Sequence, residues 1–207
     1  MEVSSSSRCL SCSVRKWRCD GARPVCAACD QQQVPCCYDW SLDKGIFELF
    51  PTRMNLNGML ALERGAQQVA NGGFARVYRT HRKTGDIVAV KVFFDHKRPP
   101  ARALELSVRE AFTWHCLDHR NIVPLLGIAD YAKICPGGFP QLCLVSPWIS
   151  DGNIMDYLKA NPGVYPLPLL MDIVSAVSYL HSFRHGPIIH GDLKGIIAHM
   201  AVDQLHA

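Results

Sequence analysis

Six cysteines near the N-terminus recur with a near-symmetric spacing. The gaps between consecutive members are two, six, six, two and six residues, for Cys9, Cys12, Cys19, Cys26, Cys29 and Cys36. Two thiolates separated by two residues can chelate one metal ion from a single turn. Six thiolates are too few for two separate four-coordinate zinc ions, but they suffice if two of the sulfurs each bind both ions. The spacing therefore predicts a module whose folding energy comes from bound zinc.

The composition argues against a secreted disulfide scaffold. Residues 1–8 contain no apolar segment of the kind found in signal peptides, and no run approaches the ~18 apolar residues of a membrane helix. We therefore expect an intracellular protein with reduced thiols and no membrane partner. The net charge of +4 is too small to demand a nucleic-acid partner by itself. The remaining cysteines are expected to be small buried hydrophobes: Cys37, Cys116, Cys135 and Cys143.

The residues between the cysteines resemble the fungal Zn₂Cys₆ binuclear cluster, a DNA-binding module. The resemblance covers roughly residues 8–38 and rests on the cysteine spacing together with residues 15–18 and 20–24. It implies two Zn²⁺ ions, with Cys9 and Cys26 as bridging ligands. Cys12 and Cys19 would complete one zinc site, and Cys29 and Cys36 the other. Cys37 is an alternative to Cys36 as the last ligand, although Cys36 keeps the even spacing.

The resemblance also implies a role for the basic residues that follow Cys12. In the family, the first short helix points its C-terminal end into the major groove of double-stranded DNA. Lys16 stands at the position of the main base contact, with Arg15 and Arg18 close to it, and the family usually reads CGG-like triplets. The alternative is a zinc-stapled module that binds no DNA. We find no heptad repeat after Cys36 that would form a dimerising coiled coil.

The rest of the chain has the patterns of an ordinary α/β domain. Residues 87–94 and 141–145 are rich in β-branched or apolar side chains and are predicted to be strands. Residues 99–117 are predicted to be a helix opened by Pro99-Pro100. Residues 169–182 are predicted to be an amphipathic helix. Its apolar positions are Leu170, Ile173, Val174, Val177 and Leu180.

Residues from about 60 to 195 resemble the front part of a protein kinase of the fungal tyrosine-kinase-like Ser/Thr type. The segment 70–78 resembles the glycine-rich loop, and Gly72, Gly73 and Val77 would contact ATP, as would Ala89 in the strand that follows. Lys91, which follows Ala89 in an apolar strand, stands where the family pairs a lysine with the ATP phosphates. Glu110 on the next helix is its expected partner. A purely structural ion pair is the alternative interpretation.

The resemblance continues to residues 188–195, the catalytic loop in its His-Gly-Asp form. Asp192 would accept the substrate hydroxyl proton, and Lys194 would steady the γ-phosphate. The family pattern then ends, because Ile197 stands where the family has a Mg²⁺-binding asparagine, and no Asp-Phe-Gly follows. ATP and Mg²⁺ are implied cofactors, but we expect no meaningful kinase turnover without these metal ligands. The interruption is explained either by a gene-model artefact or by a truncated pseudokinase.

The expected fold is a small zinc-stabilised irregular and helical module followed by an α+β protein-kinase-like fold with a complete N-lobe and a truncated helical C-lobe. The expected domains are a disordered N-terminus (1–7), the zinc module (8–40), a linker (41–60), the kinase-like domain (61–195) and a tail outside the family (196–207).

Three functions fit these patterns. The first is a nuclear, zinc-dependent DNA-binding transcription regulator joined to an inactive ATP-binding domain. The second is a Ser/Thr kinase, nuclear or cytoplasmic, whose full-length form is active and whose zinc module serves targeting. The third is a binding scaffold made of a zinc module and an inactive kinase fragment.

Overall fold

The computed structural model describes residues 8–34, 36–38, 42, 45–62, 66–71, 75–94, 100–184 and 186–190. Two compact units make up the chain: Met1–His115 with Leu125–Ser146, and Cys116–Pro124 with Pro147–Ala207. The expected N-terminal disorder at 1–7 and the tail at 196–207 lie outside the described residues. No helix within the described ranges combines the length and the hydropathy needed to cross a bilayer.

The cysteine-rich segment contains two short helices, α1 (Leu10–Arg15) and α2 (Ala27–Gln31). The backbone N–H of Cys12 donates to Cys9 Sγ at 3.4 Å, so Cys9 caps α1. Lys16 ends α1 in the left-handed conformation with φ 57°. Helices of five or six residues are not stable on their own, and the core around them is built mainly from cysteines. The stability of this segment therefore depends on the interactions that hold the cysteine sulfur atoms together.

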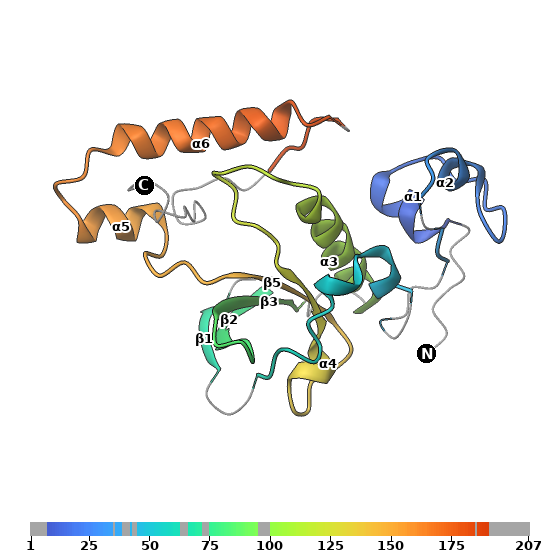
Figure 1. Cartoon of the computed structure of the whole chain (residues 1–207), viewed down its shortest axis with the longest axis horizontal. Helices are drawn as coiled ribbons and strands as arrows, with labels where there is room; N and C mark the ends of the chain where they lie inside the picture. The colour runs from blue at the N-terminus through green and yellow to red at the C-terminus, as the bar shows by residue number, and fades with distance from the viewer. Residues whose placement is uncertain are drawn as a thin grey trace. The chain divides into compact units, whose positions relative to one another are not determined.

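A five-stranded sheet forms the centre of the first unit (Figure 1). Its strands are β1 (Gln67–Asn71), β2 (Ala75–His81), β3 (Ile87–Phe93), β4 (Gly127–Asp130) and β5 (Leu142–Pro147), in the order β1-β2-β3-β5-β4. Strands β1 and β2, β2 and β3, and β4 and β5 pair antiparallel. The two predicted strands at 87–94 and 141–145 therefore correspond to β3 and β5.

Strand β3 alternates between two environments. Val88, Val90 and Val92 are fully buried, whereas Ala89 and Lys91 are half-buried. Successive side chains of a strand point to opposite faces of the sheet, so the three valines share one face and Ala89 and Lys91 share the other. The sequence run of apolar residues did not distinguish these faces.

Each face of the sheet is covered by a hydrophobic core. Helix α3 (Pro100–His115) contributes Val108 and Ala111 to the first core. The second core holds the β3 valines together with Leu56, Leu60 and Leu62, and includes residues of the short helix α4 (Tyr131–Ile134). The predicted helix at 99–117 is slightly shorter in the structure, which ends it at His115.

The segment expected to be a linker packs into the first unit. It forms two single-turn 3₁₀ helices, η1 (Phe47–Leu49) and η2 (Thr52–Met54). Ile46, Phe50 and Met54 are buried in the first core. The ring of Phe50 lies 6.3 Å from that of Phe112 on α3. These residues are therefore part of the fold of the first unit.

The second unit holds α5 (Ile154–Ala160) and α6 (Pro166–His181). The Asn153 side chain caps α5 by accepting from the N–H groups of Met155 and Asp156, and Pro166 opens α6 three residues before the predicted start. Loop 116–124 holds α6 through polar contacts, because Asn121 Nδ2 donates to Asp172 Oδ1 at 2.6 Å.

The apolar positions of α6 are only partly buried. Leu169 and Leu180 are buried, but Leu170 and Val174 are 51% and 59% exposed. Leu167 and Met171 are exposed to a similar extent. The helix is amphipathic in sequence as predicted, yet much of its apolar surface is open in the described structure.

Candidate functional site

The structure brings the six predicted cysteine ligands together. Their sulfur atoms form two groups of four, and within each group all four atoms lie within 4.8 Å of one another. The first group is Cys9, Cys12, Cys19 and Cys26, and the second is Cys9, Cys26, Cys29 and Cys36. Cys9 and Cys26 belong to both groups. This is the arrangement that two metal ions bridged by two thiolates require.

The sulfur separations fit zinc. A Zn–S bond of about 2.3 Å places the sulfurs of a tetrahedral site about 3.8 Å apart. Cys9 Sγ lies 3.8 Å from Cys26 Sγ and 3.5 Å from Cys29 Sγ, and Cys12 Sγ lies 3.5 Å from Cys26 Sγ. These sulfur pairs therefore lie at about the spacing that a tetrahedral zinc site requires.

The electrostatics of the cluster also favour a bound cation. Burial, followed by a hydrogen bond to Cys26, raises the pKa of Cys12 to about 11, and burial raises the pKa of Cys9 well above its usual range. For Cys26, burial is outweighed by hydrogen bonds from Cys29 and Cys12, which lower its pKa to about 6. Closely spaced buried thiolates repel one another, and a dication removes that repulsion while the ligands lose their protons.

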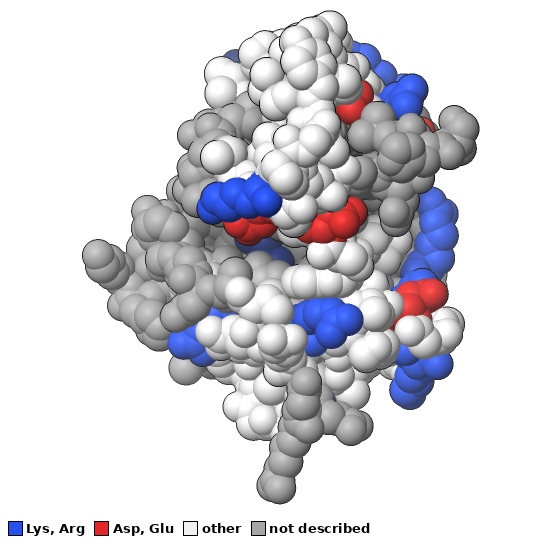
Figure 2. All heavy atoms as spheres, turned by 90° about the vertical axis from the view of Figure 1, so that its left-hand side faces the viewer, with Lys and Arg blue, Asp and Glu red and all other residues white. Residues whose placement is uncertain are grey.

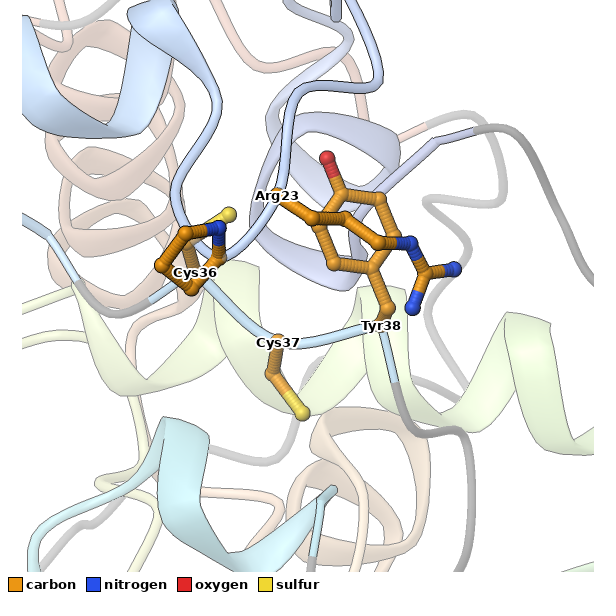
Figure 3. Close-up of a pocket in the computed structure, with 5 residues that line it drawn as sticks. Arg23, Cys36, Cys37 and Tyr38 are labelled. Carbon is orange, nitrogen blue, oxygen red and sulfur yellow. The ribbon is translucent and has the colours of Figure 1, made fainter.

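The structure separates Cys36 from its neighbour Cys37. Cys36 packs in the cysteine cluster, and its sulfur accepts from the Cys26 N–H at 3.3 Å. Cys37 instead packs against the first core of the sheet. Figure 3 shows the two side chains pointing in opposite directions, beside an open hollow lined also by Arg23, Pro24 and Tyr38. The geometry therefore supports Cys36 as the last ligand of the second group.

Two polar residues that the sequence interpretation overlooked support the cluster. Asp20 accepts hydrogen bonds from the N–H groups of Ala22 and Ala27, which links the two halves of the module. The Tyr38 hydroxyl donates to Ala22 O at 2.8 Å and lies 3.9 Å from Cys19 Sγ. Asp20 lies in the segment 20–24 on which the resemblance rests, and Tyr38 lies two residues beyond Cys36, but neither position indicated these contacts.

The three predicted DNA-binding residues lie in different environments. Lys16 and Arg18 are exposed at the end of α1. Arg15 is half-buried, and its guanidinium carbon lies 4.1 Å from the ring centroid of Phe112 and 5.0 Å from that of Trp17. The structure therefore presents Lys16 and Arg18 to solvent but places Arg15 against α3.

A second charged site lies on the first unit. Lys91 Nζ on β3 is 2.7 Å from Glu110 Oε1 on α3, with the two side chains 35% and 38% exposed. Val77 on β2 pairs directly with Lys91 in the antiparallel register, and Ala89 precedes Lys91 by two residues. Lys91, Val77 and Ala89 therefore share one face of the sheet. Three residues predicted to contact a nucleotide are thus placed together, next to the expected acidic partner of the lysine.

The remaining predicted site residues lie outside the described part of the chain. These are Gly72 and Gly73 of the glycine-rich segment, and Asp192 and Lys194 of the catalytic loop. The boundary between the two units falls between Ser146 and Pro147, at the end of β5.

Lysine and arginine form no continuous surface among the described residues on the face drawn in Figure 2. They lie there among acidic and uncharged side chains. This interspersed pattern accords with the small net charge of +4.

Comparison with known families finds two matches. The protein kinase domain model matches residues 64–196, more than half of the chain, and the model of the fungal Zn(2)-Cys(6) binuclear cluster domain matches residues 8–45. The two matches confirm the two family resemblances that the sequence motifs indicated.

Known proteins match the kinase part. L-type lectin-domain containing receptor kinase I.3 of Arabidopsis thaliana is 31% identical over 155 residues, which are 71% of this chain and 22% of the relative. Nodulation receptor kinase of Pisum sativum is 31% identical over 144 residues, 65% of this chain and 14% of the relative. The chain spans about a fifth of the length of the first curated relatives it matches. A solved structure of Rad53 1-466 in complex with AMP-PNP aligns with TM-score 0.48 and 27% identity, covering 62% of this chain and 32% of that one.

Proposed function

We propose, because this chain belongs to the protein kinase family and carries a fungal Zn(2)-Cys(6) binuclear cluster domain, that it is a zinc-dependent DNA-binding regulator joined to a nucleotide-binding kinase domain. The observation that carries the proposal is the pair of four-sulfur groups sharing Cys9 and Cys26. The six cysteines would hold two Zn²⁺ ions, and the metal would supply charge neutralisation and the cross-link between α1 and α2.

The DNA contact is assigned to Lys16 and Arg18. Two Zn²⁺ and six thiolates sum to a charge of −2, so the cluster itself does not attract phosphate. Lys16 is exposed at the C-terminal end of α1, where a lysine can reach the paired acceptors O6 and N7 of guanine. Arg18 would contact phosphate, which positions the module without reading sequence. We therefore propose a short CGG-like site, bound by one module.

Fluorescence anisotropy with a labelled CGG-containing duplex, at one fixed salt concentration, tests this proposal. Lys16→Ala should weaken binding by about 1–3 kcal/mol and reduce the preference over a duplex in which the triplet is scrambled. Lys83→Ala, an exposed lysine in the β2–β3 turn, is the matched control and should bind normally. Equal binding of both duplexes by the unmodified protein would refute sequence-specific recognition.

Nucleotide binding is assigned to the face of the sheet that carries Lys91. The observation that favours it is the 2.7 Å pair between Lys91 and Glu110, the pair that holds ATP phosphates in the kinase family. Lys91→Ala should abolish binding of a fluorescent ADP analogue, whereas Lys159→Ala, on the exposed side of α5, should not change it. Unchanged binding by Lys91→Ala would leave the lysine with a purely structural role.

We further propose that a polypeptide of these 207 residues does not transfer phosphate. Ile197 occupies the place of the family's metal-binding asparagine, and these residues contain no Asp-Phe-Gly sequence. Phosphoryl transfer depends on metal ions to neutralise the developing charge. Transfer of the radiolabelled γ-phosphate of ATP to a generic Ser/Thr protein substrate should stay at background. Turnover that is lost in Lys91→Ala would instead favour the second candidate, an active Ser/Thr kinase.

Nuclear localisation and transcription regulation follow from the zinc cluster family and belong to the same proposal. A fluorescent fusion expressed in fungal cells should accumulate in the nucleus. Retention in the cytoplasm, combined with normal nucleotide binding, would favour a kinase whose zinc module serves targeting.

A further inference from the structure

The zinc module and helix α3 share one hydrophobic core. Leu10, the first residue of α1, is fully buried, and it belongs to the same cluster as Ile46, Val108 and Ala111. A residue of a separately folded, freely tethered module would keep its apolar contacts within that module. Helix α1 is therefore packed into the core of the first unit through Leu10.

Arg15 adds a second contact at the other end of α1. Its guanidinium carbon lies 4.1 Å from the ring centroid of Phe112 on α3, which is within the range of a cation–π interaction. Trp17 lies on the same guanidinium at 5.0 Å. Trp17 of the zinc module and Phe112 of α3 thus both contact the guanidinium of Arg15. At one end of α1 Leu10 enters the core that also holds Val108 and Ala111, and at the other end Arg15 lies on Phe112 of α3.

Phe112 and Glu110 lie on different sides of α3. Residues i and i+2 of an α-helix are separated by about 200° around its axis. Because Phe112 faces α1, Glu110 lies on nearly the opposite side of α3. Glu110 there reaches Lys91 on β3 at 2.7 Å. Helix α3 is consequently held between the zinc module on one side and the lysine of the sheet on the other. Because Phe112 and Glu110 lie two residues apart on one helix, a displacement of α3 at Phe112 would move Glu110 relative to Lys91.

We propose that Arg15 is a positioning residue for the nucleotide site, acting through Phe112 and α3 on the Lys91–Glu110 pair. The zinc module thereby serves the kinase domain as well as DNA. The same contact holds Arg15 against Phe112 while α1 is docked, whereas Lys16 and Arg18 stay exposed. This inference rests on the proposed binding of nucleotide at Lys91.

Titration of the full chain with a fluorescent ADP analogue, without magnesium, tests the inference. Arg15→Ala should raise the Kd about three- to tenfold, the loss expected for one cation–π contact. Arg15→Lys, which keeps the positive charge, should restore part of the affinity. Arg23→Ala is the matched control, because Arg23 makes a cation–π contact at 4.4 Å with Tyr38 inside the zinc module and not with α3. It should leave the Kd unchanged.

Phe112→Leu keeps an apolar side chain on α3 and removes the ring. It should raise the Kd as Arg15→Ala does, and the double variant should show little additional effect, since both changes break one contact. Zinc content and amide hydrogen exchange of 108–115 accompany each titration. In Arg15→Ala, exchange in this segment should rise while the zinc content stays as in the unmodified protein.

Three outcomes overturn the inference and can be told apart. Binding that is lost in Lys91→Ala but equal in Arg15→Ala, Phe112→Leu and the unmodified protein would refute the positioning role alone. Absence of nucleotide binding by the unmodified protein would refute the proposed nucleotide site and the positioning role together. Additive effects of the two substitutions would show that Arg15 and Phe112 act separately, which also contradicts the inference.

Discussion

At the scale of single residues, neighbours in the sequence lie in different structural environments. Cys36 joins the cysteine cluster, whereas Cys37 packs against the core beneath the sheet. Lys16 is exposed, whereas Arg15 lies on the ring of Phe112. The cause is backbone direction, because adjacent side chains point to different sides of an extended segment or around a helix. The identity of the residue alone does not decide its role.

The two cysteines give a direct test of the metal site. Cys36→Ser should lower the zinc content by about one ion per chain, because hydroxyl is a poor ligand where thiolate completes a tetrahedral site. Cys37→Ser should retain the full content. Zinc is measured by inductively coupled plasma mass spectrometry on the purified, dialysed protein. Loss of zinc from Cys37→Ser with retention in Cys36→Ser would reverse the ligand assignment.

At the scale of elements, close backbone approaches fix how segments meet the sheet. Strand β4 lies directly against the segment that holds Met54 and Leu56. A Cβ atom on Gly127 would lie 2.5 Å from the backbone oxygen of Met54 and 2.8 Å from side-chain atoms of Leu56. Real Cβ atoms do not approach that closely, so this strand position requires glycine. Segment 45–62 thus packs against the edge strand β4 so closely that only glycine fits at position 127.

Gly127→Ala should destabilise the first unit by about 1–3 kcal/mol, the usual range for overpacking at a rigid site. Gly58→Ala is the control, because its Cβ would meet no atom within 4 Å. That variant should be as stable as the unmodified protein or slightly more stable. Urea denaturation followed by circular dichroism measures both. Equal midpoints for the two variants would contradict the close packing at Gly127.

At the scale of the whole molecule, apolar surface is unevenly buried. The first unit covers both faces of its sheet with cores. In the second unit, α6 leaves Leu167, Leu170, Met171 and Val174 at least half exposed. A contiguous apolar surface of this kind favours self-association in water. The two units should therefore contribute differently to the behaviour of this polypeptide in solution.

A polypeptide of these 207 residues should associate as its concentration rises. Replacing Leu170 and Val174 together by glutamine should shift association to a higher concentration, because it removes exposed apolar area without touching the buried Leu169 and Leu180. Ser178→Gln, an exposed polar position on the same helix, should have no such effect. Light scattering after size-exclusion chromatography provides the mass. A monomer at all concentrations for the unmodified protein would contradict the prediction.

The sequence by itself determined the local chemistry of this protein. The cysteine spacing specified two sulfur groups that share members, since ligand geometry follows from short-range chain geometry. The apolar runs and proline positions located β3, β5, α3 and α6 to within a few residues. The order of motifs placed Lys91 and Glu110 as partners, and the structure brings them to 2.7 Å.

Only the tertiary structure decided how distant segments meet. No pattern in the sequence indicated that Leu10 would enter the same core as Val108, or that Arg15 would lie on Phe112. Neither could the sequence show which apolar positions of α6 remain exposed. Periodicity reports the face that a helix buries, but the partner of that face depends on contacts between residues far apart in the chain. Those contacts are set by packing of whole elements, which places the guanidinium of Arg15, a predicted DNA contact, on the ring of Phe112 in α3.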